Sequence, residues 1–141
     1  MKGYLLDTNV LSEGAKQRPD TRVGEWLRQG DPQTQFVSVL SLAEIRRGAL
    51  RALDPRKSAA LERWLYDLLL RQYSDRVLPV DWRVAETWAG LAARCESAGR
   101  TLPVVDALLA ATALANDLVI VTRNVRDFQP AGVSVLDPWS R

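Results

Sequence analysis

The stretch Tyr4-Leu5-Leu6-Asp7-Thr8-Asn9 decides the fold. Its apolar residues predict a short buried strand over residues 2–6, and this strand stops abruptly at the carboxylate of Asp7. A buried carboxylate is costly unless a partner or a ligand compensates for the lost water. In open α/β sheets, ligands bind at the carboxyl ends of the strands. Asp7 therefore indicates a ligand site at a sheet edge, although it also fits a structural N-cap of the next helix.

The rest of the chain alternates between strand-like and helix-like segments. We expect further strands over residues 35–39, 77–80, 118–121 and 133–136. We expect helices over about 8–14, 41–52, 81–98 and 103–116, with two more opened by Pro19 and Pro55. This alternation predicts an α/β fold with a mostly parallel central sheet of four to five strands and helices on both faces. With neither a repeat nor a linker, residues 1–141 are expected to form one domain.

The helix opened by Pro55 shows helical periodicity in its second half. Its apolar stripe consists of Leu61, Trp64, Leu65, Leu68 and Leu69. This i, i+3, i+4, i+7, i+8 spacing predicts that all five side chains face the core.

The composition narrows the chemistry that the chain can perform. Apolar residues make up 47% and charged residues 26%, which is ordinary for a globular protein. No apolar run approaches the roughly 20 residues of a membrane span, and no signal peptide is evident, so we expect a cytoplasmic protein. The chain has no histidine, which excludes Ser-His-Asp catalysis. Cys95 is the single cysteine, so an internal disulfide is impossible, and we expect an inert buried thiol.

The basic residues give a modest hint of nucleic acid. The net charge is only +2, but 16 of the 19 basic residues are arginines. Arginine binds phosphate groups through two parallel hydrogen bonds. Genomic base composition can also favour arginine, so this bias does not decide the function by itself.

Four acidic residues are expected to meet at one edge of the sheet. Asp7 ends the first strand, and Glu44 lies in the first turns of the helix after the second strand. Asp106 lies near the start of the helix before strand 118–121, and Asp127 follows that strand. In a parallel sheet, the segments that follow the strands all lie at one edge of the sheet. A helix that runs antiparallel to the strands, toward the beginning of the next strand, starts at the same edge. We therefore expect one acidic cleft, although each acid alone fits an ordinary cap, helix-surface or loop role.

Asp106 is the strongest single member of this group. Its helix, residues 103–116, is apolar nearly all round and is therefore predicted to be buried. A carboxylate in such a helix needs a partner or a metal ion, unless it only stabilises the helix N-terminus.

Clustered carboxylates favour a bound divalent cation. Two unit charges about 4 Å apart repel by about 4 kcal/mol at an effective dielectric constant near 20. Oxygen-only ligands select Mg²⁺ or Mn²⁺ over zinc. Such an ion suits phosphodiester hydrolysis, because it activates a bound water and stabilises the leaving oxygen.

Four motifs together carry a family resemblance. They are Asp7-Thr8-Asn9, Ser41-Leu42-Ala43-Glu44, the segment Val105 to Ala111, and the segment Thr122 to Phe128. In this order and spacing the chain resembles the PIN-domain ribonucleases, and more narrowly the VapC toxins of type II toxin–antitoxin modules, including the FitB-like group. The resemblance covers essentially the whole chain.

The resemblance implies a PIN-like three-layer sandwich and an endoribonuclease that depends on Mg²⁺ or Mn²⁺. It implies Asp7, Glu44, Asp106 and Asp127 as catalytic, metal-binding acids. Asn124 matches a position that is acidic in some relatives, so either Asn124 or Asp127 completes the metal site. Three further side chains are expected to support these ligands: Thr8, Asn9 and Thr122.

The resemblance also implies partners. It suggests a homodimer, inhibition by a cognate antitoxin, and a toxin–antitoxin complex that binds operator DNA through the antitoxin. Four arginines are candidates for contacts to RNA phosphates, or else belong to solvated surfaces: Arg46, Arg47, Arg123 and Arg126.

Other functions remain open at this point. A haloacid-dehalogenase-like phosphatase also places an aspartate after its first strand, but it requires a second aspartate where this chain has Asn9. A non-catalytic PIN-like binding module predicts a broken set of acids, whereas all four are present here. A housekeeping RNA-processing nuclease of the same family is the main alternative to a toxin.

Overall fold

The core of the molecule is a parallel five-stranded sheet, seen in a computed structural model that describes residues 2–140. The strands are β1 (Gly3–Leu6), β2 (Gln35–Ser38), β3 (Val77–Leu78), β4 (Leu118–Val121) and β5 (Val135–Leu136). Their order is β3-β2-β1-β4-β5, and every neighbouring pair is parallel. The first strand thus lies at the centre, as its apolar sequence requires. This arrangement confirms the expected α/β fold.

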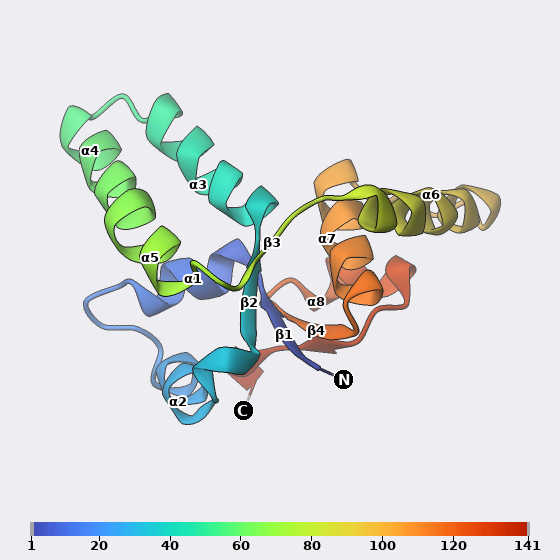
Figure 1. Cartoon of the computed structure of the whole chain (residues 1–141), viewed down its shortest axis with the longest axis horizontal. Helices are drawn as coiled ribbons and strands as arrows, with labels where there is room; N and C mark the ends of the chain where they lie inside the picture. The colour runs from blue at the N-terminus through green and yellow to red at the C-terminus, as the bar shows by residue number, and fades with distance from the viewer. Residues whose placement is uncertain (1, 141) are drawn as a thin grey trace.

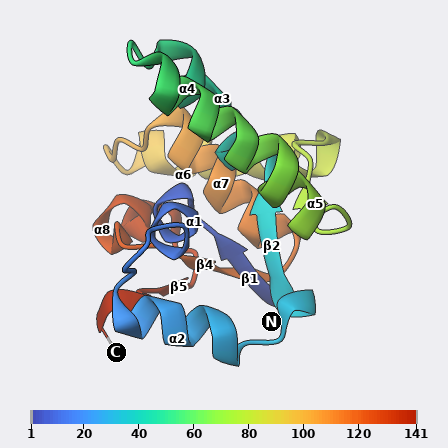
Figure 2. The ribbon, with the colours of Figure 1, turned by 90° about the vertical axis from the view of Figure 1, so that its left-hand side faces the viewer.

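One face of the sheet is covered by the helices of the N-terminal half. These are α1 (Thr8–Gly14), α2 (Thr21–Gln29), α3 (Val39–Arg51), α4 (Pro55–Arg63), the π-helical segment η2 (Trp64–Leu69) and α5 (Leu70–Gln72). They pack against Leu6, Val37 and Val121, which point from the central strands into this half of the core. Figure 1 shows α3 and α4 as an arm that extends away from the sheet. Figure 2 shows α1 between this arm and α2.

The opposite face is covered by helices of the C-terminal half. These are α6 (Trp82–Ser97), α7 (Val104–Ala115) and α8 (Val125–Phe128). Together with Cys95, which is buried as expected, they enclose Leu5, Leu118 and Ile120. Short 3₁₀ turns complete the chain: η1 (Pro32–Thr34), η3 (Gln129–Ala131) and η4 (Pro138–Ser140). The result is the expected three-layer sandwich. Among the helices within residues 2–140, none is long and apolar enough to cross a membrane.

Two neighbouring strands turn directly into helices at the carboxyl edge of the sheet. The Asp7 carboxylate accepts a hydrogen bond from the Thr8 backbone N–H and begins α1. The fully buried Ser38 hydroxyl accepts one from the Leu40 N–H and begins α3 at Val39, two residues earlier than expected. Because each helix begins at the cap, no longer loop separates β1 from α1 or β2 from α3, and the first turns of both helices lie at the sheet edge.

The apolar stripe after Pro55 is only partly buried. Leu65 and Leu69 enter the core, but Leu68 is 60% exposed. The reason is the π-helical segment, whose wider turns shift the phase of a stripe spaced for an α-helix. The prediction for Leu68 was therefore wrong.

Candidate active site

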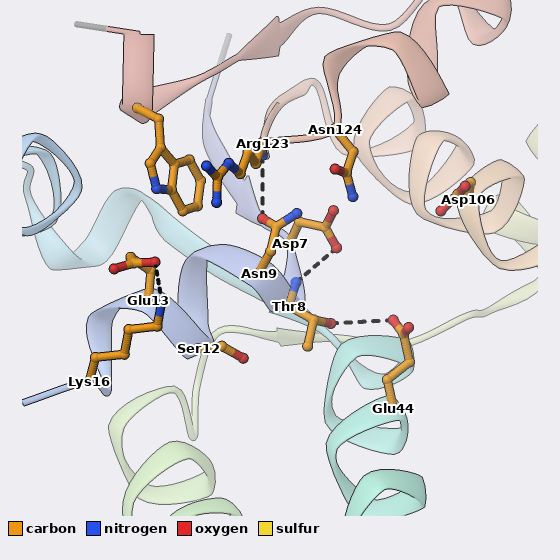
Figure 3. Close-up of a pocket in the computed structure, with 11 residues that line it drawn as sticks. Asp7, Thr8, Asn9, Ser12, Glu13, Lys16, Glu44, Asp106, Arg123 and Asn124 are labelled. Atoms are coloured by element: carbon orange, nitrogen blue, oxygen red, sulfur yellow. Dashed lines mark hydrogen bonds and ion pairs between the residues drawn. The ribbon is translucent and has the colours of Figure 1, made fainter. Parts of the chain in front are cut away.

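A cleft of about 470 Å³ opens at the carboxyl edge of the sheet. Its walls come from the ends of β1 and β4 and from helices α1, α3 and α7 (Figure 3). The lining residues are Asp7, Thr8, Asn9, Ser12, Glu13, Lys16, Glu44, Asp106, Arg123, Asn124 and Trp139. Segments that are distant in sequence therefore meet here, and three of the four expected acids line this one cleft.

Asp7 is held on both of its carboxylate oxygens. Its Oδ1 accepts the Thr8 backbone N–H at 2.8 Å, and its Oδ2 accepts the Thr122 hydroxyl at 2.8 Å. Its own backbone N–H donates to the Val121 carbonyl, which extends the pairing of β1 with β4. The position of the carboxylate is thus fixed by both central strands.

The hydroxyl of Thr122 organises the floor of the cleft. Thr122 is fully buried, and besides donating to Asp7 it accepts hydrogen bonds from two groups. These are the Asn9 side-chain amide at 3.3 Å and the Asn124 backbone N–H at 3.0 Å. One hydroxyl therefore links α1, β4 and the loop that carries Asn124.

Glu44 reaches the cleft from the second turn of α3. The Thr8 hydroxyl donates to Glu44 Oε1 at 3.3 Å, as Figure 3 shows. Thr8 thus contacts two acids, Asp7 through its backbone and Glu44 through its side chain.

Asp106 enters from the first turn of α7 and is half-buried. The helix itself is less buried than its apolar sequence predicts. Val104 is 62% exposed and Val105 is 40% exposed, whereas the core begins at Ala107. The reason is that the first turn of α7 borders the open cleft, whereas the helix joins the core through Leu109, Ala110 and Ala113.

The charges of these acids disfavour one another. Burial raises the pKa of Asp7 above its usual range, and the nearby Asp127 adds to this effect. Desolvation likewise raises the pKa of Glu44, and the charges of Asp7 and Asp106 contribute. The pKa of Asp106 is raised by burial first and then by Asp7 and Asp127. All four acids therefore belong to one electrostatic group.

Asn124 and Asp127 occupy different positions around this group. Asn124 lines the main cleft, whereas Asp127 lines an adjacent hollow of about 390 Å³. The two hollows share Arg123 and Asn124 as their common wall. Asn124 thus shares the cleft of Asp7, Glu44 and Asp106, whereas Asp127 acts through its charge on Asp7 and Asp106 from the neighbouring hollow.

The four arginines differ sharply in their surroundings. Arg46 forms an ion pair with Glu62 of α4 and lies over the Tyr66 ring, so it is held by the α3–α4 arm rather than by the cleft. Arg47 is exposed and close enough to Glu44 to oppose the rise of its pKa.

The other two arginines follow β4. Arg126 is exposed and lines the adjacent hollow. Arg123 lines both hollows and is therefore the arginine of the four that reaches the cleft.

Sequence reasoning missed four residues of the cleft. Ser12, Glu13 and Lys16 continue the face of α1 that carries Asn9, at spacings of three and four residues. That periodicity is visible in the sequence and could have identified them. Trp139 gives no such signal, because it arrives from the far C-terminal turn η4.

The donor set fits a hard divalent cation. The acidic end of the cleft offers carboxylate, amide and hydroxyl oxygens, which Mg²⁺ and Mn²⁺ prefer. Within residues 2–140, no three acidic side chains lie close enough to form a complete coordination shell. This spacing fits an ion such as Mg²⁺, which keeps several waters and uses only one or two carboxylates.

The class of protein is defined by two features together: a parallel sheet, and a cleft at its carboxyl edge that gathers acids from the β1–α1 segment, α3 and α7. The chain belongs to the PIN-domain family, whose model matches residues 4–132.

Within this family the similarity extends over nearly the whole chain. The plasmid stability protein StbB of Pseudomonas syringae pv. tomato is 36% identical over 96% of this chain and 97% of its own length. Toxin FitB of Neisseria gonorrhoeae is 33% identical over 96% and 97% of the two chains. The VapC ribonuclease Y4jK of Sinorhizobium fredii is 31% identical over 96% of each.

Solved structures give the same result. FitAcB from Neisseria gonorrhoeae superimposes with a TM-score of 0.90 at 33% identity, covering 98% of this chain and 99% of the other. FitAB bound to an IR36 DNA fragment gives a TM-score of 0.87 at 32% identity, covering 96% and 95%. The fold and the toxin-type relatives thus agree with the resemblance seen in the sequence.

Proposed function

We propose that the protein is a divalent-metal-dependent endoribonuclease and the toxin component of a type II toxin–antitoxin module. The observation that carries the proposal is the cleft that brings Asp7, Glu44 and Asp106 together, with the charge of Asp127 acting on Asp7 and Asp106. Burial first, and then the charges of neighbouring acids, raise the pKa values of Asp7, Glu44 and Asp106, so this acid set is costly to keep without a ligand. A non-catalytic binding module has no need for such a set.

In this proposal Asp7, Glu44 and Asp106 hold Mg²⁺ or Mn²⁺, one or two of them directly and the rest through the waters that the ion keeps, with Asn124 or Asp127 completing the site. When bound, the ion supplies a nucleophilic water and neutralises charge on the phosphodiester. Thr8 and Thr122 keep the Asp7 carboxylate in one orientation, and Thr8 also positions Glu44. Asn9 fixes the loop after β4 through the Arg123 backbone N–H at 3.4 Å.

The proposed partners follow from the relatives. FitB is named a toxin, Y4jK is named a ribonuclease, and FitAB was solved bound to DNA. We propose a cognate antitoxin that inhibits the nuclease, a homodimeric toxin, and operator binding through the antitoxin. RNA cleavage in the cytoplasm is consistent with this role. Genomic context separates it from a housekeeping nuclease, because a toxin gene is expected beside a small gene for a DNA-binding antitoxin.

The nuclease proposal is tested by cleavage of RNA with purified protein. We expect cleavage with Mg²⁺ or Mn²⁺, no cleavage in EDTA, and a loss of roughly 100-fold or more in Asp7→Asn and Asp106→Asn. Asp67→Asn is the matched control, because Asp67 is an exposed aspartate outside the cleft. Circular dichroism confirms that each variant is folded. Full activity in EDTA or in a folded Asp106→Asn variant would contradict the mechanism.

A further inference from the structure

The two ends of the cleft differ in charge. Figure 3 shows Glu44 and Asp106 on one side, whereas Lys16 and Glu13 lie on the other. Arg123 lies at the wall above Asn9. An RNA strand carries a negative charge at every phosphate, so a ligand that spans the cleft needs cations beyond the acidic end.

The cleft lining contains two cations, and only one has a charge that is free to act on a ligand. Lys16 Nζ lies 2.9 Å from Glu13 Oε1, so this pair is close to neutral. Arg123 takes part in none of the ion pairs formed among residues 2–140. Its positive charge is therefore available beside the acids.

Arg123 is also held in place at both ends. Its backbone N–H donates to the Asn9 side-chain oxygen at 3.4 Å. Its guanidinium carbon lies 5.3 Å from the centre of the Trp139 ring, which is a cation–π contact. Trp139 is only 8% exposed and packs in the core beneath α2. The indole is therefore a support for Arg123 rather than an open platform for a base.

We infer that Arg123, supported by Trp139, forms a phosphate-binding subsite for the nucleotide next to the scissile phosphate of a single-stranded RNA. A guanidinium binds phosphate with two parallel hydrogen bonds, and a stacked guanidinium loses little freedom on binding. The subsite rests on the proposed function, because it places the neighbouring phosphate relative to the acids. It singles out Arg123 from the other three candidate arginines.

The test measures RNA binding rather than cleavage. Fluorescence anisotropy follows a labelled single-stranded RNA of mixed sequence in EDTA, where a metal-dependent nuclease leaves the RNA intact. We expect Arg123→Gln to weaken binding roughly tenfold or more, because a charged hydrogen-bonded contact is lost. We also expect the slope of log K against log salt concentration to shrink by about 0.7, the value for one phosphate contact on a single strand.

Two further variants separate charge from geometry. Arg123→Lys keeps the charge but loses the planar fork, so it should keep the native salt slope while binding more weakly than the native protein. Arg94→Gln, an exposed arginine on α6 outside both hollows, is the matched control and should leave affinity and slope unchanged. Thermal melting of every variant verifies the fold.

The outcomes separate this inference from the proposed function. Native RNA affinity and salt slope in a folded Arg123→Gln variant would overturn the subsite while leaving the nuclease proposal intact. A loss equal to that of Arg94→Gln would also overturn it. Native protein that neither binds RNA in EDTA nor cuts it with Mg²⁺ or Mn²⁺ would remove the proposed function itself, and the subsite with it.

Discussion

Two hollows of nearly equal size lie on either side of helix α1, and their chemistry is opposite. The acidic cleft has a volume of about 470 Å³, and a second groove has about 460 Å³. The groove is formed by α1, α2 and the π-helical segment, and its wall is largely apolar, with Leu27, Trp64 and Tyr73. Because the two hollows have nearly the same volume, what distinguishes them is the placement of charged groups in their walls.

Helix α1 shows how one short segment serves both hollows. Asn9, Ser12 and Lys16 face the acidic cleft, whereas Leu11 and Ala15 face the apolar groove. Each set follows a helical spacing of three or four residues, so the two sets lie on different sides of this segment, roughly a third of a turn apart. A change on one face of α1 should therefore leave the other hollow intact.

Among substitutions outside the acids themselves, the largest difference between the hollows is expected when the buried Thr122 hydroxyl is removed. Thr122→Val keeps the side-chain volume but takes a donor from Asp7 and an acceptor from the Asn124 N–H. We expect the free energy of unfolding to fall by about 1–3 kcal/mol and RNA cleavage to fall about 10- to 100-fold. Chemical denaturation and initial cleavage rates measure these effects.

Thr112→Val is the matched control for this substitution. Thr112 is equally buried, but its hydroxyl donates to the Leu108 carbonyl within α7. It should leave cleavage unchanged, and Thr122→Ser should restore most of the activity. Equal losses of cleavage in the two valine variants would show that Thr122 acts only through general stability.

A second effect, on stability rather than on the cleavage rate, is expected from pH and metal, and it concerns the acidic cleft alone. The pKa values of Asp7, Glu44 and Asp106 are raised in the folded protein, so the folded state binds protons more tightly than the unfolded state. This contribution therefore destabilises the metal-free protein as pH rises from the usual carboxyl range through the raised values.

Divalent metal should reverse this trend. At about 100 times its Kd, Mg²⁺ should stabilise the folded state by about 2.7 kcal/mol near neutral pH, and by less in acid, where protons compete. Melting curves with and without Mg²⁺ at several pH values measure the effect. A metal-induced rise in Tm that is the same in Asp106→Asn as in the native protein would place the ion elsewhere.

The smallest effect is expected in the apolar groove. Leu68 is 60% exposed at its rim, so Leu68→Ser should change the free energy of unfolding by less than about 0.5 kcal/mol. Cleavage should stay at the native rate, because α1 separates the groove from the acids. A loss of cleavage comparable with that of Thr122→Val would show that the two hollows are coupled.

The strand positions and the acids could be predicted from sequence because each has a local signal. Apolar runs mark the strands, and the rule that parallel strands share one carboxyl edge brings Asp7, Glu44 and Asp106 together. This reasoning uses only topology, so it tolerates errors of two residues in the helix boundaries, such as the start of α3 at Val39.

Features that depend on tertiary packing could not be predicted. The π-helical segment turned Leu68 outward, and the position of the first turn of α7 beside the open cleft left Val104 exposed. Arg46 was drawn to Glu62 by the return of α4, which no spacing near Glu44 reveals. Trp139 joined the cleft from a separate turn at the opposite end of the chain.

The hydrogen bond from Thr122 to Asp7 also governs when the cleft can form during folding. It joins residues 115 positions apart, and β1 can pair with β4 only after almost the whole chain is available. Contacts of such long sequence separation form slowly, because the chain must first close a large loop. A growing chain that lacks β4 therefore cannot form the floor beneath Asp7. The synthesis order of the chain thus delays the assembly of its acidic cleft until the last strands emerge.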